Sequence, residues 1–398
     1  MEILRRIYEM TAISEVIKHP AVILMWAIGF FLLYLGIRKK YEPLLLVPIG
    51  FGLILANALG GEMNIVQDDH LAELPLVKIA KDHGIMNFLY YSLIKTGFLP
   101  PIIFMGVGAL TDFGPMLRNL RLAFFGAAAQ IGIFTVLFAA IIFGFTPKEA
   151  ASLGIIGGAD GPTAIYTTII LAPHLLGPIA IAAYSYMALV PVIIPFVVKY
   201  TTTQKELLIN MKEQDLLYPE KHPIKNIQLM KILFPLFCGG LVAVLVPTAV
   251  PLLGMFFFGN LIKEIGPTTE RLSQAASGPI MNTSTIFLGL CVGATMKYET
   301  FLDTKTLLII AGGLIAFCIS IAGGITAVKI YNVFSKKKIN PLIGATGLSA
   351  VPMAARVAND IALKYDKQNH LLHYAMASNI SGVIGSAVAA GVLITFLR

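Results

Sequence analysis

Long apolar segments recur along this chain, and short polar loops separate them. Two of these segments are less regular than the others, Val250–Ile265 and Asn282–Met296. A membrane-spanning helix needs roughly 17–25 apolar residues, so the pattern predicts an all-α polytopic membrane protein with about nine to eleven transmembrane helices. The clear segments are Ala21–Ile37, Pro43–Leu59, Phe98–Leu110, Leu122–Phe143, Pro178–Val198, Ile232–Val250, Leu307–Ile325 and Leu371–Leu397.

One apolar run, from Leu153 to Ala172, contains a carboxylate. Asp160 lies there in the sequence Gly-Gly-Ala-Asp-Gly-Pro, and glycine and proline favour a break in a helix. A carboxylate at membrane depth costs several kcal/mol and marks a functional site by default. A broken membrane helix also exposes carbonyls and helix ends that can coordinate a cation. The run therefore predicts an ion-translocating protein.

The charges of the loops predict an orientation. Basic clusters follow several segments, whereas the loop Gly60–Lys81 carries Glu62, Asp68, Asp69 and Glu73. Because cytoplasmic loops carry an excess of Lys and Arg, the acidic loop is expected outside. Alternation of the spans then requires Leu153–Ala172 to enter and leave on the outer side, or to be broken in its middle. The same counting makes a second irregular segment, Asn340–Ala358, enter from the cytoplasm.

An internal repeat supports two inverted halves, each with a broken or re-entrant segment. Val107-Gly108-Ala109 recurs as Val292-Gly293-Ala294, 185 residues later, and small residues beside Asp160 recur near Gly344 at an offset of 186. Repeats of this kind place ion and substrate sites at their interface, near the middle of the membrane. The expected division is residues 1–82 for N-terminal helices and an outer acidic loop, 83–198 for the first repeat, 199–231 for a cytoplasmic loop and 232–398 for the second repeat.

Other polar side chains in apolar surroundings are further candidates. Arg356 ends the second irregular segment; its guanidinium either snorkels to the headgroups or docks an anion bidentately. Asn340, Ser349 and Asn379 offer neutral oxygens for a hard cation, although single polar residues in membrane helices more often serve packing. Tyr186, like Tyr184, is either part of an aromatic belt at the interface or a proton donor.

Composition agrees with the membrane class. Apolar residues make up 57% of the 398 residues and charged residues 13%, against about 25% charged in soluble domains. The net charge of +8 lies in loops, so we do not interpret it as a nucleic-acid surface. Cys238, Cys291 and Cys318 all lie in apolar spans and lack metal-ligand spacing.

Three stretches carry a resemblance to a known family: Gly157–Tyr166 (GGADGPTAIY), Asn340–Arg356 and Ser378–Gly391. They resemble signature segments of the membrane β subunit of sodium-pumping biotin-dependent decarboxylases, which act on oxaloacetate, methylmalonyl-CoA or glutaconyl-CoA. The resemblance implies decarboxylation of carboxybiotin, with proton uptake, coupled to Na⁺ export. The chain would then be the membrane subunit of a decarboxylation-driven Na⁺ translocase.

The resemblance also implies roles for individual residues. Asp160 would bind Na⁺ and couple it to the proton, and Tyr186 would be the site tyrosine. Asn340, Ser349 and Asn379 would contribute to Na⁺ binding. Arg356, Ser349 and Gly344 would hold the carboxybiotin, with Asp160, Tyr186 and Arg356 as the catalytic set.

Partners follow from the same resemblance. No Met-Lys-Met biotinylation site is present, so a carboxyltransferase and biotin-carrier subunit would deliver carboxybiotin. A small single-span γ or δ subunit, a homotrimer and a prokaryotic inner membrane are also implied. The competing hypothesis is a sodium-coupled carboxylate transporter with the same repeats and an arginine for its substrate. The sequence leaves open which acid is decarboxylated and how many Na⁺ ions move per cycle.

Overall fold

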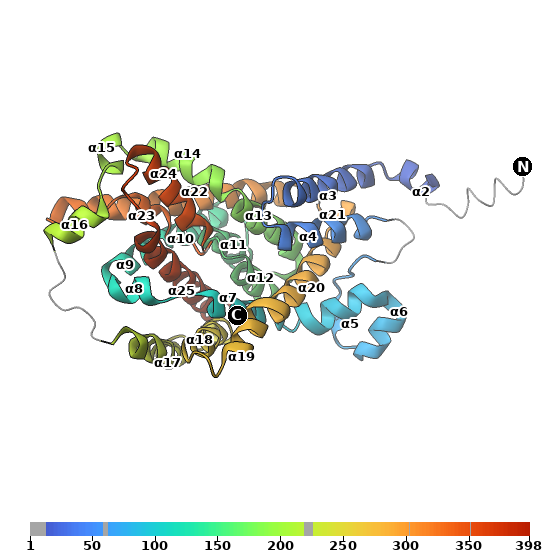
Figure 1. The fold of residues 1–398 in the computed structure, drawn as a ribbon. Helices are drawn as coiled ribbons and strands as arrows, with labels where there is room; N and C mark the ends of the chain where they lie inside the picture. The colour runs from blue at the N-terminus through green and yellow to red at the C-terminus, as the bar shows by residue number, and fades with distance from the viewer. Residues whose placement is uncertain (1–12, 59–62, 219–225, 302, 351) are drawn as a thin grey trace, which may run out of the picture.

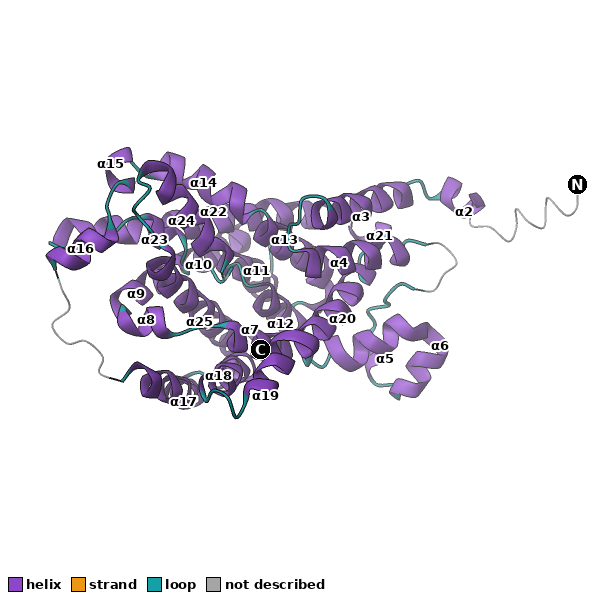
Figure 2. Ribbon diagram, in the orientation of Figure 1, coloured by secondary structure: helices purple, strands orange, loops and turns teal. Residues whose placement is uncertain are grey.

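A computed structural model describes residues 13–58, 63–218, 226–301, 303–350 and 352–398 of the chain. Every regular element in these ranges is helical (Figures 1 and 2), which confirms the all-α class. Leu59 at the end of one predicted span and Glu62 of the acidic loop lie outside the described residues.

The first half of the chain holds α2 (Ile13–Lys18), α3 (Ala21–Ile37), α4 (Pro43–Ala56), α5 (Asp69–Ala72), α6 (Leu76–Leu89), η1 (Tyr90–Ile94), α7 (Leu99–Leu110), α8 (Gly114–Arg118), α9 (Leu120–Ala129), α10 (Ile131–Ile142), α11 (Pro147–Gly154), η2 (Ile155–Gly158), α12 (Gly161–Leu171), η3 (Pro173–Leu175), α13 (Leu176–Ala188) and α14 (Val190–Thr201). The second half holds α15 (Gln204–Leu207), α16 (Met211–Leu217), α17 (Ile227–Leu245), η4 (Pro247–Ala249), α18 (Val250–Glu264), α19 (Glu270–Ala275), η5 (Ala276–Ile280), α20 (Met281–Ala294), α21 (Tyr298–Phe301), α22 (Thr304–Phe334), α23 (Leu342–Ala345), α24 (Met353–Tyr365) and α25 (Leu372–Leu397).

Several of these helices are long and apolar enough to cross a membrane. Within the described ranges, length and composition alone select 5 helices, or up to 7 spans if each bent pair of helices is one span. One bent pair is α6 with η1 followed by α7, which turns by 64° at Lys95–Phe98. Shorter apolar helices, among them α3 and α4, add to these. The chain is therefore a multi-pass membrane protein.

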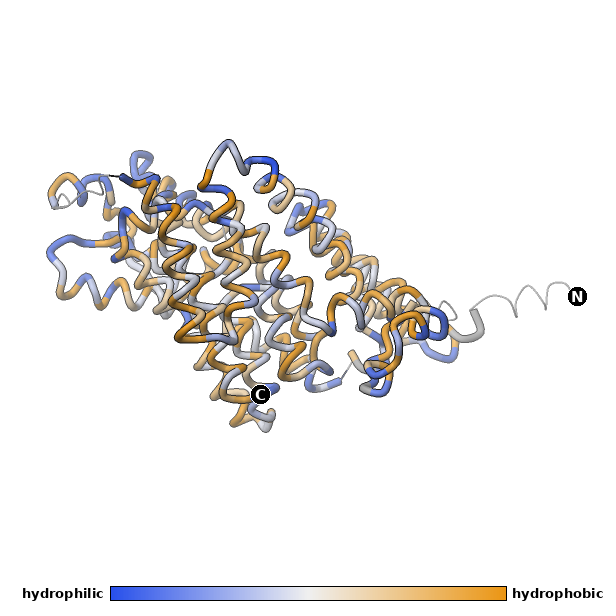
Figure 3. Tube along the Cα trace, turned by 90° about the horizontal axis from the view of Figure 1, so that it is seen from below, coloured by the Kyte–Doolittle hydropathy of each residue, from blue (hydrophilic) through white to orange (hydrophobic). Residues whose placement is uncertain are grey.

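The two ends of the long helices differ in polarity. In Figure 1 the short helices α8, α15 and α16 gather at the left, whereas α5 and α6 lie at the right. Figure 3 shows most hydrophilic segments at these two ends and hydrophobic helices between them. Because cytoplasmic loops carry an excess of Lys and Arg, we take the end with the basic loops around α15 and α16 as the cytoplasmic end and the opposite end as the outer one.

Helix packing shows a symmetry that the sequence repeat only suggested. The π-helical turns η1 and η5 begin at positions 90 and 276, 186 residues apart. Close packing of α7 on α18 and of α20 on α4 depends on glycines, because a Cβ at Gly108 would overlap the carbonyl of Phe256 and one at Gly293 that of Ile49. Small residues allow such approach between membrane helices. This arrangement favours the helix pair α3–α4 as the counterpart of α17–α18.

The Asp160 segment forms a hairpin that returns to the outer face. Helix α11 leads inward, η2 ends the descent and α12 returns. A carboxylate oxygen of Glu149, at the start of α11, lies 3.0 Å from Nε2 of His174, just beyond the end of α12, and 3.1 Å from Nζ of Lys305 on α22. Both ends of the hairpin are therefore fastened together on one side.

A second hairpin, made by α23 and α24, is fastened at the cytoplasmic end. The side-chain amide of Asn340 donates to the carbonyls of Leu207 and Ile209, each at 3.0 Å. At the other end of the hairpin, Nδ2 of Asn210 lies 2.9 Å from a carboxylate oxygen of Asp366. The two hairpins thus enter from opposite faces, as the loop charges predicted.

Cysteine accessibility tests this topology. In a parent chain without the three native cysteines, Lys148→Cys and His174→Cys should both react with a membrane-impermeant maleimide added outside intact cells. Lys367→Cys should react only from the cytoplasmic side, because α24 ends there. Labelling of position 148 from outside and position 174 from inside would show that the Asp160 segment crosses the membrane.

Candidate functional site

The two hairpins meet at their tips. The backbone N–H of Ser349 donates to the carbonyl of Gly158 at 2.9 Å. At the first tip, Ala159 adopts a left-handed conformation (φ 55°) and Asp160 is extended, so the chain turns sharply between η2 and α12. Pro162 then lies in the first turn of α12, where its missing N–H costs nothing. The glycine- and proline-rich sequence thus builds a buried turn.

Asp160 occupies the centre of this junction and is 5% exposed. One carboxylate oxygen accepts from the Thr163 N–H at 3.2 Å and so caps α12. The other accepts from the hydroxyl of Ser386 on α25 at 2.8 Å, and that hydroxyl lies 2.8 Å from the Ser349 hydroxyl. Among the described residues no Lys, Arg or His forms an ion pair with Asp160. A buried carboxylate in this setting calls for a cation or a proton.

Unused oxygens surround the junction. Within the described residues, the side-chain oxygens of Thr163 and Tyr184 are buried without a hydrogen-bond partner. The Tyr184 ring packs on Gly161, leaving no room for a Cβ there. Hard cations take carboxylate and neutral oxygen ligands. The chemistry of the junction therefore fits Na⁺.

The structure brings Ser349 to Asp160 but places Asn379 differently. Asn379 donates from Nδ2 to the carbonyl of Leu348. It precedes Ser386 on α25 by seven residues, which is about 10 Å along a helix. Asn379 therefore lies about two turns toward the cytoplasm from the hydroxyl that contacts Asp160.

Within the described residues no hydrogen bond joins Asn340 or Gly344 to Asp160, and both residues pack within the second hairpin. The NH₂ group of Asn340 donates to the carbonyls of Leu207 and Ile209 in the cytoplasmic loop. Its side-chain oxygen accepts from the Leu342 N–H at 3.0 Å. Gly344 lies against Gly324 of α22 so closely that a Cβ would overlap the Gly324 carbonyl. Their predicted ligand roles remain predictions, and their geometry supports the second hairpin.

Tyr186 also points away from the junction. Its hydroxyl donates to the carbonyl of Ile310 on α22, and its ring centre lies 6.4 Å from that of Phe317. The tyrosine beside Asp160 is Tyr184. The sequence left Tyr184 open as a belt residue or a proton donor and assigned it no site role. Ser386 was not predicted as a site residue, although it lies on the same helical face as Asn379 at a spacing of seven.

Arg356 lies in the first turns of α24 and is exposed. Within the described part of the chain it forms no ion pair. The opposite face of α24 is buried and carries Ala354, Ala355, Ala358, Ile361 and Ala362. An exposed guanidinium near the start of α24 suits both predicted roles, an anion dock and an interfacial anchor.

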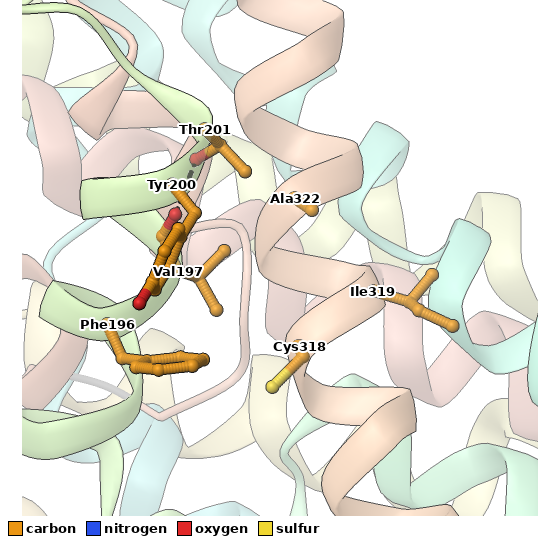
Figure 4. Close-up of a pocket in the computed structure, with 7 residues that line it drawn as sticks. All are labelled: Phe196, Val197, Tyr200, Thr201, Cys318, Ile319 and Ala322. Atoms are coloured by element: carbon orange, nitrogen blue, oxygen red, sulfur yellow. Dashed lines mark hydrogen bonds between the residues drawn. The ribbon is translucent and has the colours of Figure 1, made fainter.

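A cavity of about 470 Å³ lies between α14 and α22 (Figure 4). Its wall is apolar apart from the hydroxyls of Tyr200 and Thr201 and the thiol of Cys318, and it contains none of the predicted site residues. The lining residues are Phe196, Val197, Tyr200, Thr201, Cys318, Ile319 and Ala322. Such a wall offers no charge to an ion or to a carboxylated substrate.

Electrostatics at the outer end of the first hairpin centre on Glu149. Burial by itself would raise its pKa, but hydrogen bonds from His174, Thr146 and Lys305 outweigh burial and lower the pKa from 4.5 to about 2. The carboxylate also completes a capping box with Thr146 at the start of α11. The charged form of Glu149 therefore holds the outer end of the hairpin together.

Comparison with known proteins identifies similar chains. Residues 21–397 match the sequence model of the family described as the Na⁺-transporting oxaloacetate decarboxylase beta subunit. The oxaloacetate decarboxylase beta chain of Klebsiella pneumoniae is 45% identical over 419 residues, with 94% of each chain covered. The methylmalonyl-CoA decarboxylase subunit beta of Propionigenium modestum is 46% identical over 382 residues, again with 94% of each covered.

The Glu149 contacts predict a dependence of stability on pH. Because folding lowers this pKa, the contribution of Glu149 is complete above pH 4.5 and is lost as pH falls from 4.5 toward 2. Glu149→Gln should therefore lower the melting temperature by a few degrees at pH 6, and the difference from wild type should vanish at the acidic end. Glu73→Gln, at an exposed position, is the control and should change nothing. A constant difference at all pH values would show that packing, and not the charge, is responsible.

Proposed function

The chain belongs to the family of Na⁺-transporting oxaloacetate decarboxylase β subunits, and from this premise we propose that it decarboxylates carboxybiotin and exports Na⁺. Membership rests on the match over residues 21–397 and on relatives that are about 45% identical along nearly their whole length. The chain is thus the membrane subunit of a biotin-dependent decarboxylase sodium pump. The observation that carries the ion-pumping role is the buried Asp160 carboxylate at the meeting point of two opposed hairpins.

The choice of acid belongs to another subunit. A beta chain of oxaloacetate decarboxylase is 45% identical to this chain, and a beta subunit of methylmalonyl-CoA decarboxylase is 46% identical. Equal similarity to proteins with two different acids indicates that the β chain handles a step common to both. Carboxybiotin supplies that common step, since loss of CO₂ from it requires only a proton.

Arg356 is the residue of this chain that suits the anionic carbamate. Its guanidinium is exposed on α24, on the hairpin that opens to the cytoplasm, where a soluble biotin carrier would arrive. A planar guanidinium holds a carboxylate through two parallel hydrogen bonds. Arg356 would therefore orient the group and stabilise its charge before CO₂ leaves.

Asp160 would couple the proton to Na⁺. Its carboxylate can hold one positive partner, Na⁺ or a proton, with Ser386 and Ser349 beside it. Each partner removes the cost of the buried charge, and occupancy can bias which face of the hairpin junction is open. A proton taken up from outside would displace Na⁺ outward and then serve the decarboxylation.

The remaining components are proposals of the same kind. A carboxyltransferase with its biotin carrier, a small γ- or δ-type membrane subunit and a trimeric assembly would complete the complex, in the inner membrane of a prokaryote. The alternative of a sodium-coupled carboxylate transporter would use the same carboxylate and arginine. Relatives named as decarboxylase β chains favour the pump.

Asp160→Asn tests the ion site. The amide keeps the shape and one hydrogen-bond acceptor but carries no charge, so Na⁺-dependent decarboxylation should fall at least about a hundredfold. The melting temperature of wild type should rise with NaCl but not with KCl at equal ionic strength, and the variant should lose this difference. Retained Na⁺ transport by the variant in proteoliposomes would remove Asp160 from the ion site.

Arg356→Lys separates an anion dock from an interfacial anchor. An ammonium group snorkels as well as a guanidinium but cannot form the planar fork. We expect loss of most carboxybiotin decarboxylation with the Na⁺-dependent melting shift kept. Arg121→Lys, at an exposed position in the first turn of α9, is the matched control and should remain active. Full activity of Arg356→Lys would establish the anchor role instead.

A further inference from the structure

Gln130 lies in the middle of a predicted transmembrane span. It forms the junction between α9 and α10, inside the apolar run Leu122–Phe143, and is 6% exposed. A neutral amide buried among apolar helices is costly unless its donors and acceptor are used. The partners of its two polar atoms therefore show what it does.

The nitrogen of this amide is fully engaged. It donates to the carbonyls of Gly126, Gly347 and Gly382 at 3.0, 3.3 and 3.4 Å. Carbonyl oxygens can only accept, so these three neighbours fix which end of the amide is the NH₂ group. Gly347 belongs to the tip of the second hairpin and Gly382 to α25, so one side chain joins three elements.

The oxygen of the same amide is buried and has no partner in the described part of the chain. It faces Gly158: a Cβ placed on Gly158 would lie 3.4 Å from this oxygen and 2.9 Å from the Cβ of Ser386. Ser386 is the residue whose hydroxyl donates to Asp160. The unpartnered oxygen of Gln130 therefore lies beside Gly158 and close to Ser386, which contacts Asp160.

We propose that Gln130 is a Na⁺ ligand of the Asp160 site and, through its NH₂ group, ties the occupied site to the tip of the second hairpin. The inference rests on the proposed function and adds a residue to it. A cation beside Asp160 gives the unused oxygen its missing partner. The same ion then strengthens an amide that already holds Gly347 and Gly382, so Na⁺ binding stabilises the junction of the hairpins.

Na⁺ titrations of stability test the proposal on the full-length chain in its purified complex. The measurement is the melting temperature against NaCl, with KCl keeping the ionic strength constant. Gln130→Leu removes the oxygen at nearly constant volume and should raise the Na⁺ midpoint about tenfold to a hundredfold, as expected for one lost contact with a charge. An unchanged midpoint would overturn the proposal.

Asn260→Leu is the matched control. Asn260 on α18 is equally buried, donates to the carbonyls of Gly108 and Thr111, and has an unpartnered oxygen, but it lies where α18 packs on the end of α7. Its loss should lower the melting temperature in KCl and leave the Na⁺ midpoint unchanged. A shift equal to that of Gln130→Leu would show a general loss of stability and would count against the ligand role.

Gln130→Glu tests whether Gln130 is a Na⁺ ligand if the leucine variant does not fold. A carboxyl group keeps an oxygen toward the ion but lacks the NH₂ donors. A ligand role predicts a midpoint at or below that of wild type, whereas a purely structural tie predicts a rise like that of Gln130→Leu.

Asp160→Asn separates a failure of the Gln130 role from a failure of the proposed ion site. If it abolishes the Na⁺ response while Gln130→Leu keeps a normal midpoint, only the role of Gln130 fails; if Asp160→Asn keeps the response, the proposed ion site fails.

Discussion

The hydrogen bond from the Ser349 amide to the Gly158 carbonyl joins two chain breaks at membrane depth. Irregular backbone survives at that depth only when protein groups satisfy it, because no lipid group can. Each hairpin tip therefore depends on the other, and both depend on the helices beside them. The Asp160 carboxylate adds a second demand at the same point, since its charge needs a partner. A site for a small cation is the arrangement that meets both demands.

The two halves are alike in packing and unlike in chemistry. Glycines bring α7 against α18 and α20 against α4 in equivalent ways. The first hairpin contributes the carboxylate, the second contributes Ser349, and α25 contributes Ser386 between them. The outer hairpin is fastened by Glu149 and the inner one by Asn340 and Asn210. Each hairpin is thus anchored at its own end of the long helices, and the two hairpins meet at the site.

Local signals in the sequence predicted much of this arrangement. Hydropathy located the spans, Gly-Gly-Ala-Asp-Gly-Pro located the break, and loop charges predicted the opposed hairpins. Such local signals could not predict contacts between residues that are far apart in the sequence, such as Ser386 and Asp160, which are 226 positions apart. Helix geometry explains why the two tyrosines point in different directions, because side chains two positions apart on a helix point about 200° apart. Tyr184 therefore faces Gly161, and Tyr186 faces α22. Asn340 shows the converse case, a polar residue in a signature segment whose amide is used by a cytoplasmic loop.

Competition between Na⁺ and a proton for Asp160 is the central claim, and proton release on Na⁺ binding measures it directly. NaCl is added to the purified complex in weakly buffered detergent solution that contains a pH indicator, with KCl as the reference. Competition predicts release of protons as Na⁺ saturates the site, with a Na⁺ midpoint that rises as the pH is lowered. Saturable Na⁺ binding without proton release and with a midpoint independent of pH would contradict it.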